Sequence, residues 1–64
     1  MNPNYLAGWR RGLPYMNRNM AAAEYASQLR VAPDETDWPA LNALIVDRWS
    51  ESGLEYIKRR AHRL

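Results

Sequence analysis

The densest group of chemically capable side chains in this sequence is the run of cations near its C-terminal end. Its members are Lys58, Arg59, Arg60, His62 and Arg63. If Leu54 and Ile57 mark the apolar stripe of a helix, several of these cations project away from it. Clustered cations favour phosphates, because neutralising a nucleic-acid backbone releases condensed counterions. The run therefore indicates a nucleic-acid-binding surface, to which Arg10, Arg11 and Arg18 would add.

The same cations also fit an ordinary structural role. Cations in the last turn complement the negative end of a helix dipole and keep a small chain in solution. The formal net charge is only +2, which is less than the footprint typical of nucleic-acid-binding domains. A helix-turn-helix fits poorly, because a turn at Gly53 would place Trp49 where a small residue is needed and Glu51 near a phosphate. Nucleic-acid binding is therefore the second hypothesis.

The aromatic residues suggest a different surface. The chain has three Trp and four Tyr but no Phe. Trp and Tyr combine a large apolar body with a polar group and are enriched at interfaces, although a small core also recruits them. The aromatics least tied to an apolar stripe are Trp9, Tyr15, Trp38 and Tyr56. They make the leading hypothesis a small adaptor or inhibitor, such as a phage or accessory regulator, that docks on a larger protein or ribonucleoprotein assembly.

The sequence contains no residue pattern typical of a catalytic or metal-binding site. The chain has no Cys, and its one His, His62, has no partner with metal-ligand spacing. The acidic residues Asp34, Glu35 and Asp37 lack the spacing and the central glycine of a calcium loop. None of the three serines has a histidine at a suggestive spacing. We therefore expect no enzyme, no cofactor, no metal and no small-molecule substrate.

The elements that must position these residues are helical. Helix punctuation and apolar periodicity predict one all-α domain, 1–64, with three to four short helices at about 3–11, 19–31, 39–50 and 53–63. Asn2 and Pro3 suit the start of the first helix, and Asn17 or Asn19 the start of the second. Gly12 is expected to end the first helix in the left-handed conformation.

Proline and loop residues divide the remaining helices. Pro14 is expected to prevent the first helix from resuming. Pro33 is expected to end the second helix, because the residue before a proline avoids the helical region. Pro39 then suits the first turn of the third. In the second helix, Ala22, Tyr25, Leu29 and Ala32 recur on one face.

The C-terminal half carries two apolar stripes that are out of phase. The first comprises Leu41, Leu44, Ile45 and Trp49, and the second Leu54, Ile57, Ala61 and Leu64. On one straight helix Leu54 would lie about 220° around from Leu41, so the stripes would face different neighbours. A break between residues 50 and 53 would let both face one core. Ser52 and Glu55 have the spacing of a capping box, which favours that break.

One short segment resembles a known family. Residues 5–12, Tyr-Leu-Ala-Gly-Trp-Arg-Arg-Gly, resemble the Gly-Trp-Arg segment of bacterial ribosome modulation factors. The rest of the chain departs from that family, so no fold, partner or site residue is carried over from it.

Length and hydropathy set the remaining expectations. Sixty-four residues lie near the lower limit for independent folding, which favours a protein partner or a homo-oligomer, and a self-associating subunit is a third hypothesis. The N-terminus lacks the basic stretch and apolar run of a secretory leader. The longest apolar run, 43–46, is too short to cross a bilayer. We therefore expect a cytoplasmic protein without a membrane partner.

Overall fold

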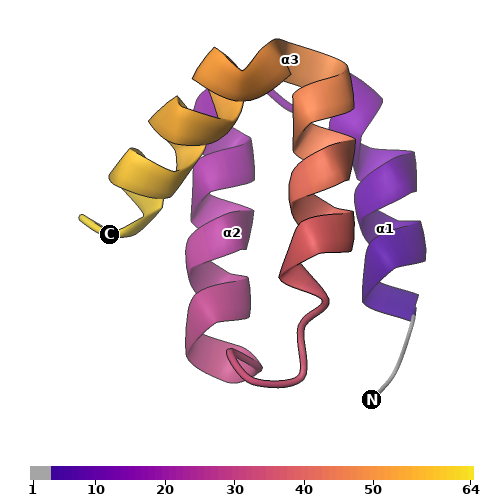
Figure 1. The fold of residues 1–64 in the computed structure, drawn as a ribbon, viewed down its shortest axis with the longest axis vertical. Helices are drawn as coiled ribbons and strands as arrows, with labels where there is room; N and C mark the ends of the chain where they lie inside the picture. Colours follow the sequence, from indigo (N-terminus) through magenta and orange to yellow (C-terminus); the bar gives the residue numbers. More distant parts are fainter. Residues whose placement is uncertain (1–3) are drawn as a thin grey trace.

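The computed structural model describes residues 4–64 and confirms the predicted all-α fold. It contains α1 (Asn4–Gly12), a 3-10 turn η1 (Leu13–Tyr15), α2 (Arg18–Val31) and α3 (Trp38–Ala61) (Figure 1). Within the described residues, 82% are helical and none forms a strand. No helix in this part of the chain is both long and apolar enough to cross a membrane.

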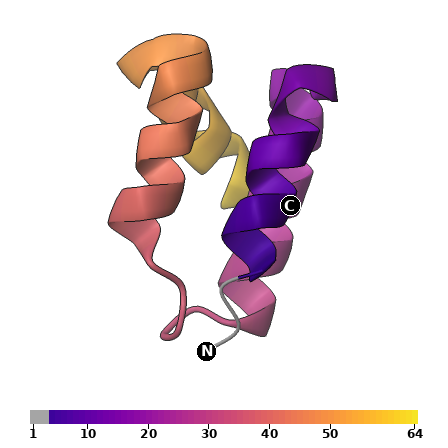
Figure 2. The ribbon, with the colours of Figure 1, turned by 90° about the vertical axis from the view of Figure 1, so that its right-hand side faces the viewer.

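The longest helix, α3, organises the bundle. Its first half lies against both α1 and α2, and after a sharp bend its second half turns back beside α2 (Figures 1 and 2). As a result α1 and the C-terminal half of α3 lie on opposite sides of the molecule (Figure 1).

The end of α1 differs from the prediction. Gly12 is right-handed, with φ −82° and ψ −31°, and the chain continues directly into η1. Pro14 does not interrupt it, because its fixed φ suits the start of a helical turn. Leu13 is buried in the core, which anchors η1. The predicted cap at Asn2 and the predicted first position at Pro3 lie outside the described residues.

The second helix is closed at both ends as expected. It begins at Arg18, one residue before the predicted start, and the Asn17 side chain accepts a 2.8 Å hydrogen bond from the Met20 backbone N–H. It ends at Val31, and Ala32 leaves the helical region ahead of Pro33. The predicted apolar face packs inward, with Ala22 and Tyr25 buried and the last two members half-buried.

The connection from α2 to α3 is held by side-chain hydrogen bonds. Buried Thr36 donates to the Ala32 carbonyl and accepts a 2.8 Å bond from the Gln28 amide. Asp37 caps α3 by accepting from the Ala40 N–H at 3.2 Å, so α3 begins one residue earlier than predicted. The Asp37 N–H in turn donates to the Tyr5 hydroxyl at 2.7 Å, which ties the loop to α1.

The predicted break in the C-terminal half is confirmed. Ser50 has φ 67° and ψ 179°, so α3 is two helical segments joined at a kink. The break falls at Ser50, and the Ser52 hydroxyl lies 3.0 Å from that of Ser50. The prediction that Ser52 and Glu55 form a capping box is therefore wrong, because the second helical segment starts before Ser52.

The bend turns both apolar stripes into one core. Leu41 and Ile45 from before the bend, and Leu54 and Ile57 from after it, are all buried. Leu64, predicted to continue the second stripe, is 59% exposed because α3 ends at Ala61. The complete set of buried apolar residues is Trp9, Leu13, Ala21, Ala22, Tyr25, Ala26, Leu41, Ile45, Leu54, Ile57 and Ala61.

Candidate nucleic-acid interface

Of the four aromatics predicted to contact a partner, Trp9 is buried and Trp38 is half-buried against the core. Trp9 is only 6% exposed and packs in the core. Trp38 is half-buried; its ring centroid lies 5.0 Å from that of Tyr25, and its indole N–H donates to the Pro33 carbonyl at 2.9 Å. In so small a core these rings supply much of the apolar volume, and this structural role accounts for the burial of Trp9.

The other two predicted contact aromatics, Tyr15 and Tyr56, are on the surface. Tyr15 projects from η1 with 86% of its surface exposed. Tyr56 is 42% exposed, and its hydroxyl donates a 2.7 Å hydrogen bond to the Asn19 side-chain oxygen. This bond joins the C-terminal half of α3 to the first turn of α2 and fixes the edge of the Tyr56 ring.

Tyr56 separates two hollows in the surface. The larger, about 540 Å³ and open to solvent, is lined by Asn17, Arg18, Asn19, Ser52, Gly53 and Tyr56. The smaller is lined by Tyr56, Arg59, Arg60 and Arg63. No carboxylate lines either hollow.

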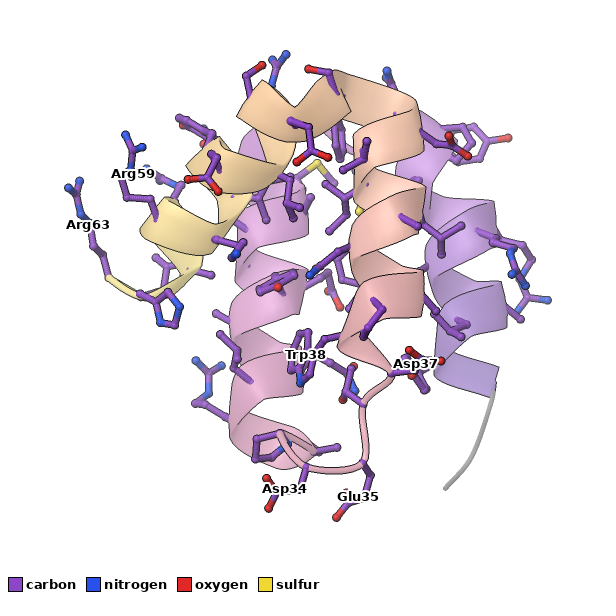
Figure 3. All side chains as sticks on the ribbon, in the orientation of Figure 1. Asp34, Glu35, Asp37, Trp38, Arg59 and Arg63 are labelled. Atoms are coloured by element: carbon purple, nitrogen blue, oxygen red, sulfur yellow. The ribbon has the colours of Figure 1, made fainter. Side chains whose placement is uncertain are left out.

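We call the surface formed by Arg18, Asn19, Tyr56, Arg59, Arg60 and Arg63 the Tyr56 face. Three of its residues, Tyr56, Arg59 and Arg60, belong to α3, and both arginines lie on the Tyr56 side of the helix because they follow it at spacings of three and four; Arg63 comes just past the end of α3. Arg59, in the last turn of α3, and Arg63, just past the end of this helix, both point outward (Figure 3). Arg18 reaches the same face from the start of α2. The result is a basic surface with an aromatic ring at its centre.

The remaining predicted basic residues do not join the Tyr56 face. Arg10 and Arg11 are exposed on α1, on the opposite side of the molecule from the end of α3 (Figure 1). Lys58 is half-buried and His62 is exposed just past the end of α3, and neither lines a hollow. The structure thus brings together four of the eight predicted nucleic-acid contacts.

The acidic residues are divided between the loop that precedes α3 and the helices themselves. Asp34 and Glu35 lie in the loop after α2, well separated from Arg59 and Arg63 (Figure 3). Within the described chain, no group of three or more His, Cys, Asp or Glu side chains is placed to hold a metal ion. On α3, Glu55 is exposed one turn before Arg59 but lines neither hollow.

The sequence predicts Tyr56 as a protein contact and the arginines as nucleic-acid contacts, although the spacing of Tyr56, Arg59 and Arg60 places these three on one side of a helix. The sequence indicates only a capping role for Asn19, because its bond to Tyr56 joins positions 37 residues apart that no local pattern connects.

Comparison of the chain with protein-family models, curated proteins and solved structures finds no match. The likeness of residues 5–12 to ribosome modulation factors therefore stands alone. Within that segment, Trp9 is a buried core residue.

Proposed function

We propose that this chain is a non-enzymatic binding protein that holds nucleic acid on the Tyr56 face. The observation that carries the proposal is the gathering of Arg18, Arg59, Arg60 and Arg63 around an exposed tyrosine, with no carboxylate in the lining. Arginine suits this role because its planar guanidinium presents several N–H donors that match phosphate oxygens.

The arrangement favours nucleic acid over an acidic protein as the partner. A polyanion supplies one phosphate per nucleotide, so several arginines on one helical side can be neutralised by a single strand. Bases also supply π-faces for the central aromatic ring, which carboxylates on a protein surface do not. Both features of the Tyr56 face are then used by one ligand.

The test compares two double variants that remove the same charge from opposite sides of the molecule. Arg59→Gln/Arg63→Gln removes two cations from the Tyr56 face, and Arg10→Gln/Arg11→Gln removes two from α1. Binding of a labelled oligonucleotide, measured by fluorescence anisotropy at low salt, is expected to weaken about 10-fold or more in the first variant. The α1 variant is expected to change it much less. Equal losses in both, or no binding by the unmodified protein, would contradict the proposal.

Docking on a larger protein, as an adaptor or inhibitor, is the second candidate. It is favoured by Tyr15, which stands 86% exposed on the short η1 turn. Tyrosines so presented are frequent anchors at protein interfaces. Capture of a protein from the native lysate that is lost on Tyr15→Ser, yet retained in Arg59→Gln/Arg63→Gln, would favour this role over nucleic-acid binding.

A further inference from the structure

The ring of Tyr56 is held in a position where a ligand can pack against it. Its hydroxyl is fixed by the 2.7 Å bond to Asn19, and 42% of the side chain remains exposed. A ring that is both exposed and fixed loses little rotamer freedom when a ligand covers it.

Arginine side chains lie on both sides of the Tyr56 ring. Arg18 lies in the hollow on the α2 side of Tyr56, whereas Arg59, Arg60 and Arg63 line the hollow on the other side. A strand that crosses the ring therefore meets guanidinium groups before and after it. From Tyr56 to Arg60 α3 rises about 6 Å, and the chain continues past the helix end to Arg63, which gives the strand room to place more than one phosphate.

An unpaired base satisfies this arrangement better than a duplex does. In a duplex each base is already stacked on its neighbours, and its faces are inaccessible to a side chain on the outer surface of a helix. The polar groups of Asn17, Asn19 and Ser52 line the same hollow as Tyr56 and offer partners to the edge of a splayed base.

We infer that the Tyr56 face binds single-stranded nucleic acid, with one unpaired base stacked on the Tyr56 ring and the flanking phosphates on Arg18, Arg59, Arg60 and Arg63. This inference rests on the proposed function and adds the class of nucleic acid. It assigns Tyr56 to stacking and the arginines to backbone contact.

The experiment measures anisotropy of two labelled probes, an unpaired pyrimidine oligonucleotide and a duplex of equal length. The unmodified protein is expected to prefer the unpaired probe. Tyr56→Leu should weaken binding of the unpaired probe roughly 10-fold, because stacking on an aromatic ring is lost. Tyr56→Phe keeps the ring and should stay within about 3-fold of the unmodified protein.

Two further variants keep the inference falsifiable. Tyr56→Trp presents a larger ring and should bind the unpaired probe at least as tightly, so the outcome does not depend on Tyr56→Leu folding. Tyr15→Leu removes another exposed tyrosine and should change nothing. Salt-dependent binding that is insensitive to Tyr56→Leu, or equal for both probes, would overturn this inference and leave the proposed function standing. Binding of neither probe would overturn the proposed function as well.

Discussion

Ser50 makes the fold possible at the cost of backbone strain. Its φ of 67° with ψ of 179° lies in a region that residues with a Cβ rarely occupy. A helical Ser50 would relieve the strain but would leave the two apolar stripes facing different directions. The burial of Leu41 and Leu54 in one core shows which requirement prevails. The strain at one residue is thus maintained by packing on both sides of it.

Replacing Ser50 by glycine should stabilise the protein. Ser50→Gly removes the Cβ that disfavours this conformation, and after the added chain entropy of glycine the gain is about 1 kcal/mol. Urea unfolding followed by circular dichroism measures it. Ser50→Ala is the control, since it deletes the hydroxyl but keeps the Cβ, and no stabilisation is expected. A glycine variant less stable than the alanine variant would show that Ser50 is not strained.

Gly53 and Gly8 should respond to alanine in opposite ways. A Cβ at Gly53 would overlap the Cβ of Trp49, which cannot swing aside as a flexible side-chain end can. Gly53→Ala should therefore destabilise the protein by about 1–3 kcal/mol. Gly8 is exposed on α1, and a Cβ placed there meets nothing within 4 Å. Gly8→Ala should therefore stabilise the protein by about 0.5–1 kcal/mol. Thermal unfolding of the two variants measures these changes. A shift of the melting temperature in the same direction for both variants would contradict the close contact between residue 53 and Trp49.

Residue-level prediction succeeded where the signal is local. The Asn17 cap and the break near Ser50 each depend on a few neighbouring residues or on a simple period, and both are present. The role of Trp9 was only partly predictable in this way. Its spacing from Tyr5 and Leu6 places it on the apolar side of α1, but how deeply it is buried depends on what the other helices bring against it.

At the scale of elements, the contact between α2 and α3 dominates. Tyr25 of α2 packs against Trp38, and its hydroxyl donates to the Asn42 side-chain oxygen at 2.9 Å. Burial raises the pKa of the Tyr25 phenol above its ordinary value, because the phenolate would lose its hydration. The pairing of the two helices is therefore linked to the protonation of this group.

This linkage predicts a loss of stability at alkaline pH. A raised folded-state pKa means that the contribution of Tyr25 is complete below the ordinary value of 10.0 and falls as the pH rises through the folded-state value. Tyr25→Phe should cost about 1 kcal/mol near neutral pH, where the hydrogen bond to Asn42 is lost. The difference between the two proteins should shrink above about pH 10. Urea unfolding midpoints of the two proteins, measured near neutral pH and above about pH 10, test this prediction. A difference in stability that stays the same at the two pH values would contradict the linkage.

The order and approximate ends of the helices were predictable because proline, asparagine and apolar periodicity mark them. The Tyr56 face was not, because it joins the first turn of α2 to the last turns of α3. Its members Arg18 and Tyr56 meet only once the bend at Ser50 has turned the second half of α3 back beside α2 (Figure 1). The bend itself was predicted, but its direction was not.

At the scale of the whole molecule, charge is distributed unevenly over a small body. The principal extents are 28 × 24 × 18 Å, so the molecule offers a ligand an outer face more readily than an enclosed cleft. The net charge of the chain is only +2, but the positive charge of the Tyr56 face is locally higher. Four arginines lie on that face, whereas Asp34 and Glu35 lie in a separate loop (Figure 3). Local concentration of charge, more than its total, is what a polyanion meets.

The salt dependence of oligonucleotide binding tests the central claim most directly. If Arg18, Arg59, Arg60 and Arg63 each neutralise one phosphate of a single strand, the logarithm of the affinity should fall against the logarithm of salt with a slope of roughly −3. Arg59→Gln/Arg63→Gln should reduce the magnitude of that slope by about half, while Arg10→Gln/Arg11→Gln leaves it unchanged. A slope near zero, or one reduced equally by both variants, would contradict the account.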